Sequence, residues 1–154
     1  MPPVWDSLAA EDIITAHEAL EGPMLPILHA LQARFGCIPE EAIRLVAARL
    51  NLSRAEVHGV VSFYHDFRRQ PAGRHVLKLC RAEACQSMGG EVNAAHLLRR
   101  LGLEWGATTP DGRLTVEAVY CLGLCACAPN AMLDGEVHGR LGAQALEALA
   151  MEAS

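Results

Sequence analysis

Cysteine is the residue type in this chain most capable of chemistry, and five of the six cysteines gather in two short segments. The segments CRAEAC and CLGLCAC contribute Cys80, Cys85, Cys121, Cys125 and Cys127. Several thiolates at one point need a soft cation or an iron–sulfur cluster, because bare thiolates repel one another and do not stay deprotonated. If the two segments meet in the fold, they predict a metal or redox site.

The spacing within each segment bears on which metal is bound. Four residues separate Cys80 from Cys85, and three separate Cys121 from Cys125. Structural zinc sites use shorter gaps, typically of about two residues, so the wider spacing favours a two-iron cluster with bridging sulfides, with zinc as the alternative. A Rieske centre needs two histidine ligands, and none of the seven histidines lies in either segment.

The second segment holds three cysteines, and two of them are needed to complete a set of four ligands with Cys80 and Cys85. Gly123 lies midway between Cys121 and Cys125 and allows a tight backbone turn with both sulfurs facing inward. Cys125 and Cys127 would also share a face if the segment were extended. Spacing alone leaves both pairings open.

The N-terminal sequence and the hydropathy bear on the redox compartment. MPPVWDSLAAEDIITAHEAL has neither the basic region nor the unbroken apolar region of a secretory signal, and no apolar run reaches the ~18 residues that cross a bilayer. We therefore expect a cytoplasmic protein without a membrane span, in which thiols stay reduced. A disulfide framework is then disfavoured relative to metal or redox chemistry.

Length and composition describe an ordinary globular chain. The 154 residues are 51% hydrophobic and 20% charged, enough for one domain or for a small domain with a helical extension. The formal net charge is −5, and no basic patch or stripe marks a nucleic-acid-binding face. Nucleic acid is therefore not an expected partner.

Helical periodicity dominates the first half of the chain. Helices are predicted over residues 7–21, 24–35, 39–50 and 53–67. Ser53 and Glu56 have the spacing of a capping box at the start of the fourth helix. Phe63, Tyr64 and Phe67 recur at helical spacing in that helix, and we expect them to be core residues, with contact with a partner subunit as the alternative for some of them.

The pattern changes after QPAGR, residues 70–74, which is the expected domain boundary. Beyond it the sequence predicts strands over 75–80 and 113–121, helices over 89–103 and 143–152, and a hairpin turning at Asp134-Gly135. The predicted fold class is α/β, with an N-terminal helical bundle over 1–72 and an α/β domain with a small mixed sheet over 73–154. Both cysteine segments begin where a strand ends, so they are expected at one edge of the sheet.

An ordered set of motifs is similar to a known family. The chain resembles the thioredoxin-like [2Fe-2S] ferredoxins over about residues 20–150. The resemblance lies in Cys-x4-Cys followed after 35 residues by CLGLCACAP, in the P-x-G-x-H that leads into Cys80, and in FGCIPEEAI and AEVHGVVSFYHDF. This family includes the 24 kDa-type subunit of respiratory NADH dehydrogenase. The short N-terminus and CLGLCACAP are most similar to the gamma subunit of soluble, NAD-linked, molybdenum-containing formate dehydrogenase.

The resemblance carries specific implications. It implies a thioredoxin-like fold for residues 73–154 and one [2Fe-2S] cluster, with Cys80 and Cys85 on one iron and Cys121 and Cys125 on the other. It implies a partner flavin subunit that holds FMN and exchanges hydride with NAD, docked by the helical bundle, and a larger molybdenum subunit. The chain itself would transfer electrons without acting on substrate. Equivalent subunits of NAD-reducing hydrogenase and of NADH dehydrogenase are alternatives.

Several other residues have alternative interpretations. Cys37 and Cys127 are expected to pack in the core, as free cysteines often do. Lys78 and Arg81 flank the first ligand and either raise the cluster's reduction potential or are solvated cations. Pro129 lies where thioredoxin folds commonly have a cis-proline. The chain lacks the G-x-G-x-x-G dinucleotide fingerprint, and it lacks the C-x-x-C of a dithiol oxidoreductase.

Overall fold

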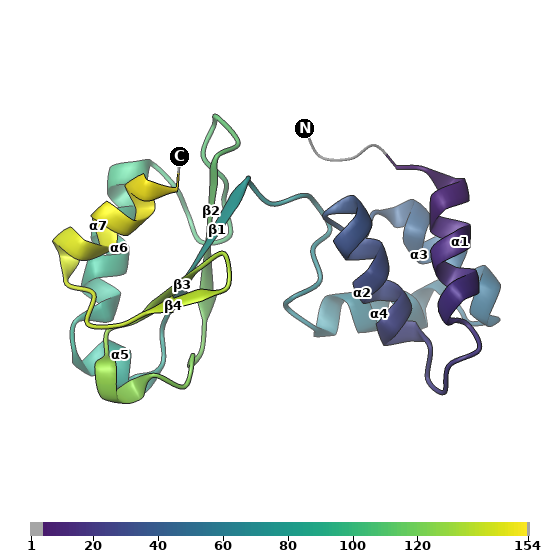
Figure 1. The fold of residues 1–154 in the computed structure, drawn as a ribbon, viewed down its shortest axis with the longest axis horizontal. Helices are drawn as coiled ribbons and strands as arrows, with labels where there is room; N and C mark the ends of the chain where they lie inside the picture. The colour runs from purple at the N-terminus through teal and green to yellow at the C-terminus, as the bar shows by residue number, and fades with distance from the viewer. Residues whose placement is uncertain (1–4, 154) are drawn as a thin grey trace. The chain divides into compact units, whose positions relative to one another are not determined.

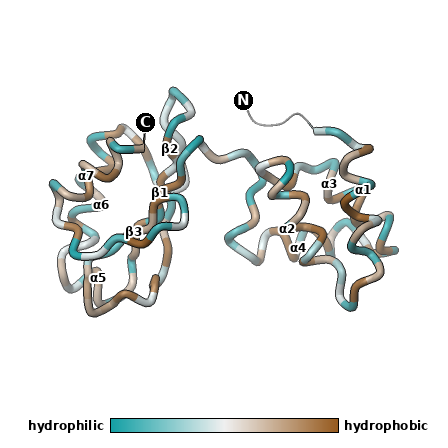
Figure 2. Tube along the Cα trace, viewed as in Figure 1, coloured by the Kyte–Doolittle hydropathy of each residue, from teal (hydrophilic) through white to brown (hydrophobic). Residues whose placement is uncertain are grey.

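The computed structural model describes residues 5–153, which form seven α-helices, four β-strands and one short 3-10 helix (Figure 1). The chain divides between Pro71 and Ala72 into two compact units, one helical and one α/β. Hydrophobic segments run through both units (Figure 2), and each unit has its own buried core. The predicted fold class, a helical bundle followed by a thioredoxin-like α/β part with a small mixed sheet, is confirmed.

The helical unit contains four helices with recognisable start and stop signals. They are α1 (Ser7–His17), α2 (Met24–Phe35), α3 (Glu40–Leu50) and α4 (Arg54–Phe63). Asp6 caps α1 by accepting from the Leu8 amide, Gly36 ends α2 with a φ of 75°, and Ser53 opens α4 with a complete capping box. The fully buried core includes Ile14, Leu28, Leu31, Ile43 and Val57.

Two of these helices end earlier than the sequence predicts. The first ends at His17 rather than residue 21, and the fourth ends at Phe63 because the backbone of Tyr64 is extended. The early end takes Tyr64 off the buried face of the helix, and Tyr64 is 44% exposed. Phe63 is 73% exposed because it lies on the face of α4 opposite the buried Val57 and Val61. The prediction that both are core residues was wrong, whereas Phe67 is buried as expected.

The α/β unit is built on a mixed sheet in the order β2-β1-β3-β4. Strand β1 (His75–Cys80) pairs in parallel with β2 (Leu114–Val119) and antiparallel with β3 (Ala131–Leu133), and β4 (Glu136–His138) pairs with β3. Helices α6 (Gly90–Leu101) and α7 (Ala143–Glu152) lie on the same side of this sheet (Figure 1). Because β1 and β2 are parallel, both carboxyl ends, with their cysteines, reach the same edge.

The hairpin between β3 and β4 fixes the opposite end of β1. Asp134 and Gly135 both have positive φ, 49° and 93°, as a tight hairpin turn requires. The Asp134 carboxylate lies 2.6 Å from Nδ1 of His75 and accepts from the Val76 amide at 2.8 Å. Partial burial raises the pKa of Asp134, but the bonds from His75 and Val76 outweigh it, so the pKa lies below its usual value.

Within the described residues, no helix is both long enough and apolar enough to cross a bilayer.

Candidate metal centre

The first cysteine segment places two buried thiols at the sheet edge. Cys80 is the last residue of β1, and Cys85 lies in α5 (Glu83–Ser87), a short helix that the sequence did not predict. Cys80 is 6% exposed and Cys85 is 1% exposed. The two thiols affect each other's protonation, because burial and then the nearby Cys80 raise the pKa of Cys85, so the segment delivers one pair of sulfurs on the inner side of the site.

The second segment places an exposed pair beside the first. Cys121 follows β2 with a φ of 81°, Gly123 has a φ of 78°, and Cys125 opens the short 3-10 helix η1 (Cys125–Cys127). These turns bring Sγ of Cys121 to 3.6 Å from Sγ of Cys125, and the Gly123 amide donates to Cys121 Sγ at 3.4 Å. The turn expected at Gly123 is confirmed. Both thiols are exposed, unlike Cys80 and Cys85.

This geometry fits an iron–sulfur cluster. Two thiolates bound to one tetrahedral metal through bonds of about 2.3 Å lie about 3.8 Å apart, close to the separation of Cys121 and Cys125. Two pairs of cysteine sulfurs match the Cys₄ ligand set of a [2Fe–2S] cluster. Among residues 5–153, no group of three or more His, Cys, Asp or Glu side chains is arranged to hold a single metal ion.

Backbone amides and neighbouring sulfurs set the protonation of the thiols. Burial raises the pKa of Cys80, but hydrogen bonds from the amides of Ala82, Cys121 and Leu122 and from the Cys85 thiol bring it below its usual value. The Cys80 thiolate therefore receives donors from both segments. Burial raises the pKa of Cys85, and the hydrogen bond and charge of Cys121 raise the pKa of Cys125, so the sulfurs interact as a group.

Arg81 connects the first segment to its surroundings. Its Nε and Nη2 atoms each donate to Glu91 at 2.9 Å, and its guanidinium lies 4.8 Å from the ring centroid of Trp105. The Glu91 carboxylate, through these bonds, raises the pKa of Arg81 above its already high value. Arg81 is therefore a paired cation rather than a solvated one.

Three of the remaining expectations concern single residues. Cys37 is buried in the helical unit, as predicted, and burial raises its pKa. Cys127 is only partly buried; a Cβ added to Gly139 would lie 2.8 Å from its Cβ, so it packs closely against that residue. The peptide bond before Pro129 is cis, as expected from the thioredoxin-like pattern.

The sequence interpretation missed the residues that hold the two segments together. Asn130, Glu91 and Trp105 carry no metal-ligand signature, yet Asn130 lies directly behind the site: its carbonyl accepts from the Cys80 amide at 3.2 Å, and its side chain donates to the Leu124 carbonyl at 2.9 Å. Its position immediately after Pro129 was the only available signal.

The fold and the paired cysteine loops define a class of protein, and comparison with known proteins identifies it. The model of the thioredoxin-like [2Fe-2S] ferredoxin family matches residues 10–154. The chain therefore belongs to this family of cluster-binding electron-transfer proteins.

Similar proteins in other organisms are components of larger enzymes. A component of the NADH-quinone oxidoreductase of Escherichia coli K12 is 36% identical over 92% of this chain and 88% of its own length. The HndA component of the NADP-reducing hydrogenase of Solidesulfovibrio fructosivorans is 35% identical over 79% of this chain and 71% of its own.

A solved structure has the same fold. A chain of the NAD+-reducing [NiFe]-hydrogenase in the H2-reduced state superposes with a TM-score of 0.68 at 27% identity, over 82% of this chain. The match spans only 22% of that hydrogenase chain.

Proposed function

We propose that this protein is an electron-transfer subunit that carries one [2Fe-2S] cluster on Cys80, Cys85, Cys121 and Cys125, next to the FMN of an NAD-linked partner subunit. When bound, the cluster accepts and donates one electron at a time. The chain's own residues supply two thiolate pairs and the amide donors that offset their charge. The observation that carries the proposal is the convergence of two cysteine loops at one edge of the sheet, with Cys121 and Cys125 already 3.6 Å apart.

The third cysteine of the second segment gives an internal control for the ligand assignment. Cys127 packs against Gly139, whereas Cys125 contacts Cys121. Reconstituted protein should show the visible absorption of an iron–sulfur cluster, with equal iron and labile sulfide. Cys121→Ser and Cys125→Ser should lose this signal, whereas Cys127→Ser and Cys37→Ser should keep it. Full iron content and an unchanged spectrum in Cys121→Ser would refute the assignment.

A zinc-stabilised interaction module is the second candidate function, because the 3.6 Å between Sγ of Cys121 and Sγ of Cys125 would also suit two ligands of one zinc ion. Purified protein of this kind would be colourless and contain zinc without labile sulfide. Metal and sulfide analysis of protein purified without air distinguishes the two functions in one experiment.

The partner proposal starts from the relatives, which belong to NADH-quinone oxidoreductase and NADP-reducing hydrogenase. Beyond these two enzymes, we propose the soluble NAD-dependent formate dehydrogenase, with a molybdenum catalytic subunit, on the resemblance of CLGLCACAP to its gamma subunit. Purification of the tagged chain from its native cells tests this. A complex with FMN and molybdenum that reduces NAD with formate supports it, and nickel or a quinone-reducing activity assigns the chain to the alternatives instead.

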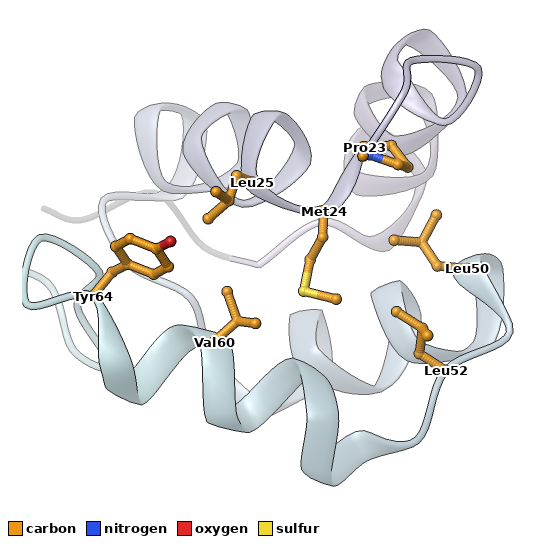
Figure 3. A pocket seen from close by; sticks show the side chains of 8 residues that line it. Pro23, Met24, Leu25, Leu50, Leu52, Val60 and Tyr64 are labelled. Atoms are coloured by element: carbon orange, nitrogen blue, oxygen red, sulfur yellow. The ribbon is translucent and has the colours of Figure 1, made fainter.

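The helical unit offers a face suited to the flavin subunit. An apolar pocket of about 370 Å³ lies between the start of α2, the end of α3 and α4 (Figure 3). The Met24 side chain occupies its middle, with Tyr64 and Leu25 toward one end and Leu50 and Leu52 toward the other (Figure 3). The exposed Phe63 extends this face, and aromatic and methionine side chains are enriched in protein interfaces.

The docking proposal is testable apart from the cluster. Phe63→Ser should weaken binding to the flavin subunit at least tenfold, as loss of a buried aromatic anchor does. Val92→Ser, a similarly exposed apolar residue of the α/β unit, is the matched control, because it removes exposed apolar surface elsewhere. Equal affinities for wild type and Phe63→Ser would reject this face.

A further inference from the structure

Asn130 contacts both cysteine loops although it is not a ligand. Its main-chain carbonyl accepts from the Cys80 amide at 3.2 Å. Its side-chain Nδ2 donates to the carbonyl of Leu124, the residue before Cys125, at 2.9 Å. One residue therefore holds Cys80 through its backbone and the exposed loop through its side chain.

Packing does not explain an asparagine at this position. Asn130 is 5% exposed, and its Oδ1 accepts no hydrogen bond from the described residues 5–153. A buried acceptor without a donor carries a desolvation cost, which an apolar side chain of similar shape would avoid. The amide orientation follows from this contact, because Nδ2 can donate to the Leu124 carbonyl whereas Oδ1 can only accept. What the asparagine provides is therefore the bond to Leu124.

That bond acts on an exposed turn. Cys121 and Gly123 both have positive φ, and Cys121 and Cys125 are exposed. The other contacts of this segment lie on the side of Gly139 and Arg140, where the Arg140 amide donates to the Cys127 carbonyl at 2.6 Å. Leu124 also accepts from the Cys127 amide at 2.9 Å, which closes the short helix η1. The Asn130 side chain thus anchors the carbonyl on which the position of Cys125 depends.

We propose that Asn130 is a positioning residue for the metal centre, whose side-chain amide holds the Cys121–Cys125 loop in register with the buried Cys80–Cys85 pair. The proposal rests on the proposed cluster site. Substituting the side chain leaves the bond between the Asn130 carbonyl and the Cys80 amide in place, so Cys80 keeps its position and only the exposed pair loosens.

Asn93 provides a matched control. It lines the same small cavity as Asn130, and its Nδ2 donates to the Leu141 carbonyl at 3.2 Å, outside both cysteine loops. Asn130→Leu and Asn93→Leu are the same chemical change. Each removes one side-chain donor at a neighbouring site, but only the first removes a bond to a cysteine loop. Asn130→Ala, a smaller change, covers the case in which leucine does not fit.

The first measurement uses the cluster-loaded protein. Asn130→Leu and Asn130→Ala should lose iron to a chelator at least tenfold faster than wild type, and the paramagnetic spectrum of the reduced protein should change shape. Asn93→Leu should stay within twofold of wild type with an unchanged spectrum, even if its thermal midpoint falls. Chelation rates and spectra of folded Asn130 variants that match those of Asn93→Leu would overturn the proposal.

The second measurement separates this proposal from the proposed function, because it needs no cluster. In the cluster-free, reduced protein, hydrogen exchange at the Cys127 amide should be at least fivefold faster in Asn130→Leu than in wild type, with the β1 amides unchanged. Unchanged exchange at Cys127 would overturn the positioning role even if iron binds. Failure of the wild type to bind iron, with accelerated exchange in the variant, would overturn the proposed function alone.

Discussion

The two cysteine pairs of this protein differ in how the fold holds them. Cys80 and Cys85 are buried, on the end of a central strand and in a short helix, whereas Cys121 and Cys125 are exposed on a turn with two residues at positive φ. The buried pair is part of the core, and its geometry follows from the packing of the sheet. The exposed pair depends on local turns and a few hydrogen bonds. The same ligand chemistry is thus supported by global packing on one side and by local conformation on the other.

The largest expected effect tests this difference at the ligands themselves. Cys85→Ser and Cys125→Ser should both lose the cluster, but they should differ in the cluster-free protein. A hydroxyl in place of the buried Cys85 thiol should lower the free energy of unfolding by about 1–3 kcal/mol, and Cys125→Ser should change it by no more than about 0.5 kcal/mol. Urea unfolding of the reduced, cluster-free variants measures both. Equal losses of stability would contradict the contrast.

Two glycines that are not ligands pack closely against cysteine residues, one against a proposed ligand and one against Cys127. A Cβ at Gly90 would lie 2.7 Å from the Cys85 carbonyl oxygen, and a Cβ at Gly139 would lie 2.8 Å from the Cys127 Cβ. Both alanine variants should lose about 1–3 kcal/mol of stability through overpacking. Gly90→Ala presses on the backbone of a proposed ligand, whereas Gly139→Ala presses on Cys127 and on the end of the flexible Leu124 side chain. The iron content after reconstitution should therefore fall further in Gly90→Ala than in Gly139→Ala.

The control for these variants lies in the helical unit. Gly59 is inside α4 and has open space around it, so Gly59→Ala should stabilise the protein by about 0.5–1 kcal/mol. A loss of stability in Gly59→Ala would show that a methyl group added to a glycine destabilises this protein even where no atom lies close, so the other two variants would not report on close packing. Equal iron contents in Gly90→Ala and Gly139→Ala would remove the distinction between ligand and non-ligand cysteines.

A smaller effect concerns the charge beside the buried pair. Glu91→Gln leaves the Arg81 guanidinium uncompensated one residue from Cys80, and an unpaired positive charge favours the more negative, reduced state of the cluster. The reduction equilibrium constant should rise about threefold, which is about 28 mV at 59 mV per tenfold change. A potentiometric titration followed by the paramagnetic signal measures it.

Glu147→Gln is the charge-matched control for this shift. Glu147 pairs with His96 and Arg100 in the same α/β unit, away from the cysteine loops. Glu147→Gln changes the net charge by the same amount as Glu91→Gln. If the reduction potential rose equally in both variants, the cause would be the overall charge rather than Arg81.

The sequence predicted the elements whose formation depends on packing better than those that depend on local conformation. The strand ending at Cys80 and the helices of both units follow from periodicity and capping residues, because their side chains report directly on burial. The α5 helix was missed because five residues are too few to show a helical period. The exposure of Tyr64 was missed because it depends on where α4 ends, and helix ends are the least predictable part of a pattern. The exposure of Phe63 was missed because it lies on the face of α4 opposite Val57 and Val61.

The site shows the same limit. The cysteine spacing indicated both segments and the family resemblance implied the four ligands, but the residues that support the two segments are distant in sequence or have no chemical signature. Trp105 lies against Arg81 only because the fold brings the two together, and Asn130 acts through one carbonyl of the opposite loop. No local pattern encodes such contacts, so only the structure shows them.

The smallest expected effect tests whether the far end of β1 is independent of the metal centre. Ionised Asp134 accepts from His75 and Val76, and its pKa is below the unfolded value of about 3.9. Its stabilising contribution is therefore present above about pH 3.9 and is lost as the pH falls through the lower, folded pKa. Asp134→Asn should lower the stability of the cluster-free protein at pH 6 by no more than about 1 kcal/mol, because the pair is partly exposed.

The difference between wild type and Asp134→Asn should shrink as the pH falls from about 6 to about 3, which urea midpoints at both values measure. Glu136→Gln, which removes a carboxylate from the same hairpin, should show no such convergence. Hydrogen exchange at the amides of Cys121–Cys127 should be the same in Asp134→Asn and wild type, because the ion pair lies at the opposite end of β1 from Cys80. Faster exchange there would mean that the hairpin end of β1 and the exposed cysteine loop open together, and the local support assigned to Cys121 and Cys125 would have to include the whole strand.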